Sequence, residues 1–366
     1  MTASGATAIS AVRAAVYRFP TERPEADGTF RWDATTVVTV HLDAGGVTGL
    51  GWTYSSPAAA AVVHAHLADA VRDQDAFDVG AGWTAMRRTC RNVGVPGLVM
   101  QAISAVDIAR WDLKARLLDT SLTCLLGRAR PAMPVYGSGG FVSMTDAQLA
   151  EQVRSWQDAG CRDVKIKIGE SWGNEVERDL ARVRRLRELA GDGVRAMVDA
   201  NGAYSLAQAR RVGHTLDDLG VVWFEEPVSS DDTAGLAVLR DTLRCDIAAG
   251  EYVSDPIGAR VLLPAVDCLQ LDVTRCGGYT GWLGAAALAQ AHCRQVSGHC
   301  APALHLPVAC AVPNLRHVEW FADHARLEPA LFDGVPTVRD GQMSPDPDAP
   351  GHGMRLSERA ERWCVG

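Results

Sequence analysis

From about Pro134 onward, short apolar runs alternate with longer stretches of helical periodicity. The runs have the length of strands that are buried on both faces. They lie at 134–138, 163–167, 195–199, 221–225, 246–250, 267–272, 294–298 and 317–320. Helical patterning fills the segments between them, for example 174–190, 205–219 and 279–292. Eight strands joined by helical crossovers favour a closed parallel barrel. An open doubly wound sheet is the alternative, although no glycine-rich phosphate loop follows an early strand.

The first part of the chain has a different pattern. Residues 8–18 and 35–54 have the composition of strands, and a turn at 43–46 divides the second range. Residues 57–72 and 98–118 carry helical periodicity, and the second of these buries one face. This part is therefore expected to form an α+β unit of its own.

These patterns predict two domains. We expect an N-terminal α+β capping domain at 1–129 and a barrel domain at 130–333. The remaining segment, 334–366, is rich in proline, glycine and aspartate and ends in a polar helix near 357–364. We expect this segment to pack back on the capping domain.

Three acids stand at the ends of successive predicted strands. Asp199, Glu225 and Glu251 are evenly spaced, 26 residues apart, which is about one strand, one helix and two loops. The carboxyl ends of parallel strands meet at one face of a barrel, where active sites are built. Three converging carboxylates repel one another and need a cation, and hard oxygen ligands favour Mg²⁺. The spacing therefore predicts a magnesium site.

Lys165 and Lys167 lie two residues apart in the strand at 163–167, so their side chains share one face. If that face points into the barrel, we expect their mutual repulsion to lower the pKa of one ammonium group. That lysine would then act as a base near neutral pH. The alternative is an exposed strand end with two solvated lysines.

Asp272 and His299 end the next pair of strands and are also one strand-helix unit apart. An aspartate on the neighbouring strand would fix the tautomer of His299 and raise its basicity. A purely structural histidine is the alternative. Glu319 ends the eighth strand, where we expect a protonated acid that donates a hydrogen bond to a substrate oxygen.

Composition narrows the class of protein. The 366 residues are 47% hydrophobic and 22% charged, and the net charge is −8, which disfavours nucleic acid as a partner. The ten cysteines form no CxxC pair, so we expect reduced thiols, with Cys276 and Cys300 serving in packing. Neither a secretory signal nor an apolar run of membrane-spanning length is present, and we expect a cytoplasmic protein.

The order of the candidate active-site residues along the chain resembles that of the mandelate racemase subgroup of the enolase superfamily. These candidates are Lys165, Lys167, Asp199, Glu225, Glu251, Asp272, His299 and Glu319. The stretches 105–114, 199–202 and 224–227 (Ala-Val-Asp-Ile-Ala-Arg-Trp-Asp-Leu-Lys, Asp-Ala-Asn-Gly and Phe-Glu-Glu-Pro) resemble further motifs of that subgroup. The resemblance implies a modified TIM barrel, (β/α)7β, with an α+β capping domain. Asp272 stands where the muconate-lactonizing subgroup has a lysine, and Glu251 where glucarate dehydratases have an asparagine.

The resemblance also implies chemistry. Mg²⁺ on the three acids would chelate a substrate carboxylate, and a base would remove the α-proton to give an enediolate. Lys167, assisted by Lys165, would face one side of the α-carbon. His299, oriented by Asp272, would face the other. Glu319 would hydrogen-bond a carboxylate oxygen.

In similar proteins a loop of the capping domain closes over the barrel mouth and reads the distal part of the substrate, and we expect the polar loop at 20–33 to do so here. Its charges suit a polyhydroxylated acid, although they would equally suit a solvated surface. The candidate substrate-binding residues are Arg23, Trp32, Ser138, Asn201 and Arg275, with Tyr279 and His305 as further polar candidates.

The leading hypothesis is dehydration of a sugar acid to a 2-keto-3-deoxy acid. A racemase or epimerase acting at the same α-carbon is the alternative enzyme, and a non-catalytic barrel that binds a small acid is the alternative from another class. By analogy, we expect a homo-oligomer, either a dimer or an octamer.

Overall fold

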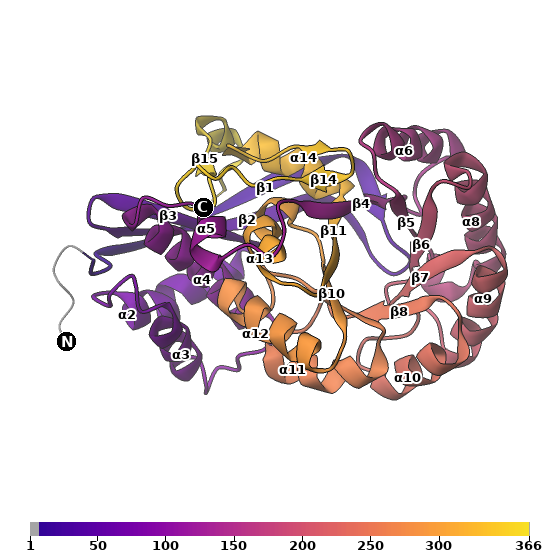
Figure 1. Cartoon of the computed structure of the whole chain (residues 1–366), viewed down its shortest axis with the longest axis horizontal. Helices are drawn as coiled ribbons and strands as arrows, with labels where there is room; N and C mark the ends of the chain where they lie inside the picture. Colours follow the sequence, from indigo (N-terminus) through magenta and orange to yellow (C-terminus); the bar gives the residue numbers. More distant parts are fainter. Residues whose placement is uncertain (1–6, 366) are drawn as a thin grey trace.

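Eight parallel strands close into a barrel in the computed structural model, which describes residues 7–365 (Figure 1). In ring order they are β4 (Met133–Gly139), β5 (Asp163–Lys167), β6 (Arg195–Asp199), β7 (Val221–Glu225), β8 (Asp246–Ala249), β9 (Cys268–Leu271), β10 (Gln295–Gly298) and β11 (Leu315–Phe321). Pairing of β11 with β4 closes the ring and excludes an open sheet. The predicted barrel is confirmed.

Helices surround the barrel. They are α6 (Asp146–Asp158), α7 (Glu170–Gly173), α8 (Val176–Ala190), α9 (Leu206–Asp218), α10 (Thr233–Thr242), α11 (Pro256–Leu262), α12 (Gly278–Ala291), α13 (Pro302–Ala311) and α14 (Ala322–Leu331). Local sequence sets where several of them begin. Thr145 with Gln148 and Ser205 with Gln208 form reciprocal capping boxes at the starts of α6 and α9. Inside the barrel, a small apolar cluster fills the level below the strand ends and leaves those ends to polar side chains: Tyr136, Met197, Trp223, Ala248 and Cys268.

A separate three-stranded antiparallel sheet precedes the barrel, with strand order β1 (Ala11–Ala26), β2 (Arg31–Ala44) and β3 (Val47–Tyr54). Helices α1 (Ala58–Val62), α2 (Ala68–Val71), α3 (Val79–Thr89), α4 (Leu98–Leu117) and α5 (Leu122–Leu126) accompany it, with a π-helical turn at Val63–Leu67. Gly49 and Gly51 of β3 let α4 approach closely, since a Cβ at either position would collide with the α4 backbone.

The segment predicted as a loop at 20–33 is instead a long hairpin. β1 continues to Ala26, and β2 begins at Arg31. The turn between them is held by Asp27, whose Oδ1 accepts the backbone N–H groups of Thr29 and Phe30 at 2.6 and 2.7 Å. This Asx-turn at Asp27 joins the two strands, which therefore extend beyond the range that hydrophobic alternation marked.

The last segment contacts both parts of the molecule, and in Figure 1 it lies beside β1. Its regular pieces are β13 (Val338–Arg339), β14 (Gln342–Met343), β15 (Arg355–Leu356) and a 3₁₀ helix at Glu358–Trp363, and β15 pairs with β12 (Phe332–Asp333) just before the segment. β14 pairs with β4 of the barrel. The ring centroids of Trp363 and Phe19 are 4.5 Å apart, and His352 Nε2 lies 2.8 Å from the Leu50 carbonyl oxygen in β3. The domain boundaries given above remain a prediction.

Within residues 7–365, no helix combines the length and the apolar character needed to cross a membrane.

A buried carboxyl group joins α4 to the start of α12. Asp107 accepts the Thr280 backbone N–H at 2.9 Å and the Thr280 hydroxyl at 2.7 Å. Burial raises the pKa of Asp107 to about 7, against the opposing effect of the Thr280 hydrogen bonds. The folded state therefore holds this proton more tightly than the unfolded state, and the associated stability is lost as the pH rises from about 4 to about 7.

Asp107→Asn should remove this pH dependence, because the amide does not ionise. Between pH 5 and pH 8, the unfolding free energy of the wild type should fall by about 2 kcal/mol relative to the variant. Urea unfolding of both proteins at the two pH values measures this difference. Parallel pH profiles would show that the Asp107 carboxyl does not change its charge in this range.

Candidate active site

Three carboxylates meet at the carboxyl ends of the barrel strands. Asp199 and Glu225 are the last residues of β6 and β7. Glu251 lies just after β8, from which Gly250 separates it. Each of the three offers an oxygen that lies within 4.8 Å of the others, and all three residues are buried. Parallel strands that end at one face bring about this convergence, as the even spacing of the acids predicted.

Both lysines of β5 point into this group. Lys165 Nζ lies 2.7 Å from each oxygen of Glu225 and 2.8 Å from Glu319 Oε1, and Lys167 Nζ contacts Asp199. Neither side chain is solvated, which excludes the exposed strand end.

The expected lowering of a lysine pKa does not occur in this structure. Burial favours the neutral amines, but attraction to the carboxylates outweighs it, so the pKa values of Lys165 and Lys167 are raised above the usual value. Repulsion between two ammonium groups is smaller here than their combined attraction to Asp199, Glu225 and Glu319. The sequence could not supply that balance, because the third carboxylate comes from the far end of the chain.

His299 follows β10 and pairs with Asp272, which follows β9. His299 Nδ1 lies 2.8 Å from Asp272 Oδ2, while Asp272 Oδ1 accepts the N–H and the hydroxyl of Thr274, both at 2.7 Å. Burial opposes ionisation of Asp272, yet the hydrogen bond to His299 and the charge of Arg275 lower its pKa to about 2. The pKa of His299 is raised against burial by Cys300, Glu251 and Asp272. The predicted pairing is therefore present, and Asp272 orients the imidazole.

Glu319, in β11, differs from the expectation of a protonated acid. Its Oε1 accepts the Ser138 hydroxyl at 2.6 Å, and its Oε2 accepts the Cys300 N–H at 2.9 Å. Although burial alone would raise its pKa, Lys165 and His299 lower it below the usual value. The carboxylate is held ionised because it receives donors on both oxygens.

A cavity of about 570 Å³ opens above these groups. The expected substrate-binding residues Trp32, Asn201 and Arg275 line it, together with residues that the sequence did not single out: Phe30, Thr35, Tyr54, Tyr252, Asp323 and His324. Tyr54 ends β3 of the capping sheet and His324 lies near the start of α14, so neither belongs to the barrel strand ends that the sequence marked. His324 Nδ1 accepts the Ala301 N–H at 3.0 Å, so the proton of the neutral ring sits on Nε2.

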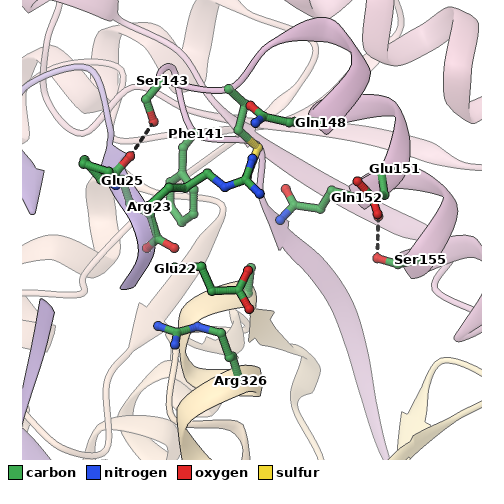
Figure 2. A pocket seen from close by; sticks show the side chains of 13 residues that line it. Glu22, Arg23, Glu25, Phe141, Ser143, Gln148, Glu151, Gln152, Ser155 and Arg326 are labelled. Carbon is green, nitrogen blue, oxygen red and sulfur yellow. Dashed lines mark hydrogen bonds between the residues drawn. The ribbon is translucent and has the colours of Figure 1, made fainter. Parts of the chain in front are cut away.

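Four other candidates lie outside this cavity. Arg23 lines a separate pocket of about 340 Å³, where Figure 2 shows it beside Gln148 and Gln152 of α6. A register shift between Pro20 and Glu25 in β1 accompanies this placement: Glu25 binds the Trp32 indole N–H at 3.0 Å, and Arg23 is exposed.

The remaining candidates are buried in supporting positions. Among residues 7–365, Ser138 contacts the site through Glu319, whose Oε1 accepts its hydroxyl at 2.6 Å. Tyr279 lies on α12 and is fully buried, and its hydroxyl has no hydrogen-bond partner among residues 7–365. His305 Nε2 lies 3.1 Å from the Leu271 carbonyl oxygen and 3.2 Å from the Val273 backbone nitrogen. His305 therefore supports the turn that carries Asp272.

The donor set at the three strand ends fits Mg²⁺. All candidate ligand atoms are carboxylate oxygens, which a hard cation prefers. Beside them, Glu226 Oε1 and Asn201 Oδ1 are buried and have no hydrogen-bond partner within residues 7–365. Such oxygens accept hydrogen bonds from the water ligands that Mg²⁺ retains. Glu226 was missed as a site residue, although it is the second acid of the Phe-Glu-Glu-Pro motif.

The hairpin tip docks on the β5–α8 connection at the cavity rim. Trp172 N–H donates to the Gly28 carbonyl oxygen at 3.0 Å, and a Cβ at Gly28 would collide with the backbone of Ile168 and Gly169.

Gly28→Ala should therefore lift the hairpin and raise KM for the substrate about tenfold, with a smaller change in kcat. Steady-state kinetics measures both. Gly193→Ala is the matched control, because a Cβ there meets nothing within 4 Å. Equal KM values for all three proteins would exclude a contribution of this docking.

Comparison with known proteins agrees with this geometry. Residues 11–127 match the mandelate racemase/muconate lactonizing enzyme N-terminal domain, and residues 148–360 match the enolase C-terminal domain-like family. A mandelate racemase/muconate lactonizing enzyme-like protein from Rubrobacter xylanophilus is 43% identical, with a TM-score of 0.95 over 98% of this chain and 100% of that one.

Two further relatives differ in the activity that they are named for. A racemase from Streptomyces coelicolor, solved with bound magnesium, is 32% identical, with a TM-score of 0.92 over 98% of this chain and 100% of that one. L-talarate/galactarate dehydratase from Salmonella typhimurium is 34% identical over 87% of this chain and 79% of that protein. The chain therefore belongs to the mandelate racemase/muconate lactonizing enzyme family of the enolase superfamily.

Proposed function

We propose that this chain is a Mg²⁺-dependent lyase that dehydrates a sugar acid to a 2-keto-3-deoxy acid. The observation that carries the proposal is the arrangement at the barrel mouth. Two lysines of β5 and the His299–Asp272 pair flank three buried carboxylates beneath a polar cavity. The relative named as a talarate/galactarate dehydratase supports the same reaction class.

Asp199, Glu225 and Glu251 would hold the metal. Mg²⁺, when bound, supplies positive charge that stabilises the negative charge developing on the substrate carboxylate as the α-proton leaves. Glu226 and Asn201 would orient the water ligands of the metal through their unpartnered oxygens.

The remaining steps belong to side chains around the metal. A cation on Asp199 would weaken the attraction that raises the pKa of Lys167, and Lys167 in its neutral form would then remove the α-proton. Lys165 fixes Glu225 and Glu319 through its three short contacts. His299, held by Asp272, donates a proton from Nε2 to the departing 3-hydroxyl group. Arg275 Nη1 lies 3.1 Å from Glu251 Oε1, and Arg275 Nε lies 3.4 Å from Asp272 Oδ2. Arg275 thus positions both a metal-binding carboxylate and the partner of His299.

The cavity lining favours a polyhydroxylated substrate. Thr35, Tyr54, Asn201 and His324 place hydroxyl, amide and imidazole groups around it. Racemisation or epimerisation at the same carbon is the second candidate. It is favoured by the presence of a base on each side of the metal site and by the Streptomyces relative named as a racemase.

A library of sugar acids assayed with Mg²⁺ in D₂O tests the proposal and separates the two candidates. A dehydratase should give a 2-keto acid with solvent deuterium at C3, because tautomerisation of the enol protonates that carbon. Deuterium at C2, with every hydroxyl retained, would overturn dehydration in favour of racemisation or epimerisation.

We also infer a homo-oligomer, a dimer or an octamer, acting in the cytoplasm on this small-molecule substrate. The homo-oligomer is supported by an apolar surface that includes Ile257 and Val261, which line one surface pocket and are each more than half exposed. Burial of such a surface stabilises association. Light scattering of the purified chain measures the mass, and a monomeric value would contradict this inference.

A further inference from the structure

A cysteine that the proposed reaction does not use lies directly beside its acid–base groups. Cys300 packs on one side against Phe141 and Phe321, as expected for a packing residue. On the other side, its Sγ lies 3.4 Å from His299 Nε2 and 3.4 Å from Glu319 Oε2. His299 Nε2 and Glu319 Oε2 are 3.7 Å apart. The three atoms thus form a nearly equilateral triangle of sulfur, nitrogen and oxygen.

This triangle has the dimensions of one face of a zinc site. Zinc bonds of about 2.3 Å to sulfur and about 2.0–2.2 Å to nitrogen and oxygen place tetrahedral ligands roughly 3.4–3.6 Å apart. The three separations at Cys300 fall within a few tenths of an ångström of that range. A cation could therefore bind with small side-chain adjustments.

The other atoms of the same residues are already anchored. His299 uses Nδ1 to bind Asp272 at 2.8 Å, which is the carboxylate–histidine arrangement that orients zinc ligands. Glu319 uses Oε1 to bind Ser138 and Lys165, at 2.6 and 2.8 Å, and so leaves Oε2 on the side of the thiol. Each candidate ligand atom is therefore held in position from behind.

The backbone also holds the thiol toward this point. Cys300 and Ala301 both adopt left-handed conformations, with φ of 50° and 40°, which cost free energy in residues that carry a side chain. The Cys300 N–H donates to Glu319 Oε2 at 2.9 Å and so ties the turn to β11. The thiol is therefore fixed over its two neighbours by the same turn that ends β10.

We propose that His299, Cys300 and Glu319 form a second metal site, which takes a thiophilic divalent cation such as Zn²⁺ and blocks the active site when it is filled. Soft thiolate and imidazole ligands select such cations over Mg²⁺. Binding breaks the S–H bond of Cys300 and the Nε2–H bond of the protonated His299 ring: the thiolate and the neutral imidazole become ligands, two protons leave to solvent, and nothing is oxidised or reduced. The bound cation then occupies His299 Nε2, the atom that the proposed reaction needs for proton transfer.

Glu251 makes the two metal sites antagonistic. Its Oε2 lies 3.2 Å from His299 Nε2, so it borders the second site while also belonging to the magnesium triad. Two divalent cations that share this neighbourhood repel each other. Excess Mg²⁺ should therefore weaken Zn²⁺ binding without displacing the thiolate ligand.

Binding can be measured without turnover, so this test is independent of the proposed function. The purified chain with saturating Mg²⁺ is titrated with Zn²⁺ by calorimetry and with Co²⁺ by absorption spectroscopy. We expect one Zn²⁺ site per chain, weaker than in the absence of Mg²⁺, and a thiolate-to-cobalt charge-transfer band. Cys300→Ser should weaken Zn²⁺ binding at least 100-fold and remove the band. The carboxylate triad contains no sulfur and cannot produce that band.

Cys124→Ser and Cys293→Ser are matched controls, because both thiols are exposed and lie outside the site. They should leave the band and the Zn²⁺ affinity of the wild type unchanged. Absence of the band in the wild type, or equal Zn²⁺ affinity in wild type and Cys300→Ser, would overturn the site.

The inhibitory effect rests on the proposed function and is tested separately. Once a substrate is identified, micromolar Zn²⁺ should inhibit the wild type at least tenfold more strongly than Cys300→Ser. Cys300-dependent binding without inhibition would establish the site and count against the proton-transfer role of His299.

Discussion

Replacing Glu225 by glutamine is expected to abolish turnover while the protein stays folded. The substitution keeps the shape of the side chain and removes one of the three negative charges that would hold Mg²⁺. We expect Mg²⁺ affinity to fall about 100-fold and kcat/KM to fall about 10³-fold or more. Calorimetric titration with Mg²⁺ and steady-state kinetics measure the two effects.

Folding should survive because no buried charge loses all of its partners. Lys165 keeps Glu319 at 2.8 Å and Asp199 at 3.7 Å, and the Trp223 indole N–H, now 2.9 Å from Glu225 Oε2, can still meet an amide oxygen. A stability loss of about 1–3 kcal/mol is expected. Glu188→Gln, at an exposed ion pair of α8, is the control and should behave as wild type. Full activity of Glu225→Gln after exhaustive chelation would contradict the metal assignment.

Removing either base should stop net turnover and leave a different residual activity in each case. Lys167→Ala and His299→Asn should each lower kcat by about 10²–10⁴-fold, the range of a lost general acid or base. His299→Asn should still exchange the substrate α-proton with solvent, because Lys167 remains in place. Nuclear magnetic resonance in D₂O follows that exchange, while product formation is measured in parallel.

Lys114→Ala provides the control for this pair of variants. Lys114 is the first of the three lysines in the sequence, lies on α4 and donates to the Phe77 carbonyl oxygen at 3.2 Å, far in sequence from the strand ends. It should retain wild-type kinetics. Normal turnover in both Lys167→Ala and His299→Asn would refute a reaction that uses two proton-transfer groups.

Much of the barrel was determined by the sequence alone. The predicted strands at 163–167, 195–199 and 221–225 agree with the structure at both ends. Their signal is strong because strands buried on both faces are continuous apolar runs. The positions of Asp199 and Glu225 follow directly, since a residue that ends a parallel strand must lie at the carboxyl face of the barrel.

Tertiary structure decided what sequence spacing does not encode. Whether Lys165 and Glu319 are ionised depends on how many opposite charges surround them, and those charges come from strands far apart in the chain. The register shift in β1 places Arg23 in the pocket of Figure 2 instead of the barrel mouth. Such register shifts depend on how two strands pair and pack. The residue pattern of one strand alone does not contain that information.

The surroundings of Cys300 show the same division. The sequence places a cysteine directly after His299 and predicts that it packs in the core, which its contacts with Phe141 and Phe321 agree with. Only the left-handed turn at 300–301 and the arrival of β11 bring Glu319 within 3.4 Å of the thiol. Periodicity and spacing thus determined which strands end at the site, because burial leaves a local pattern. Charge state and ligand geometry were decided by the closed barrel, because they depend on groups that only the fold brings together.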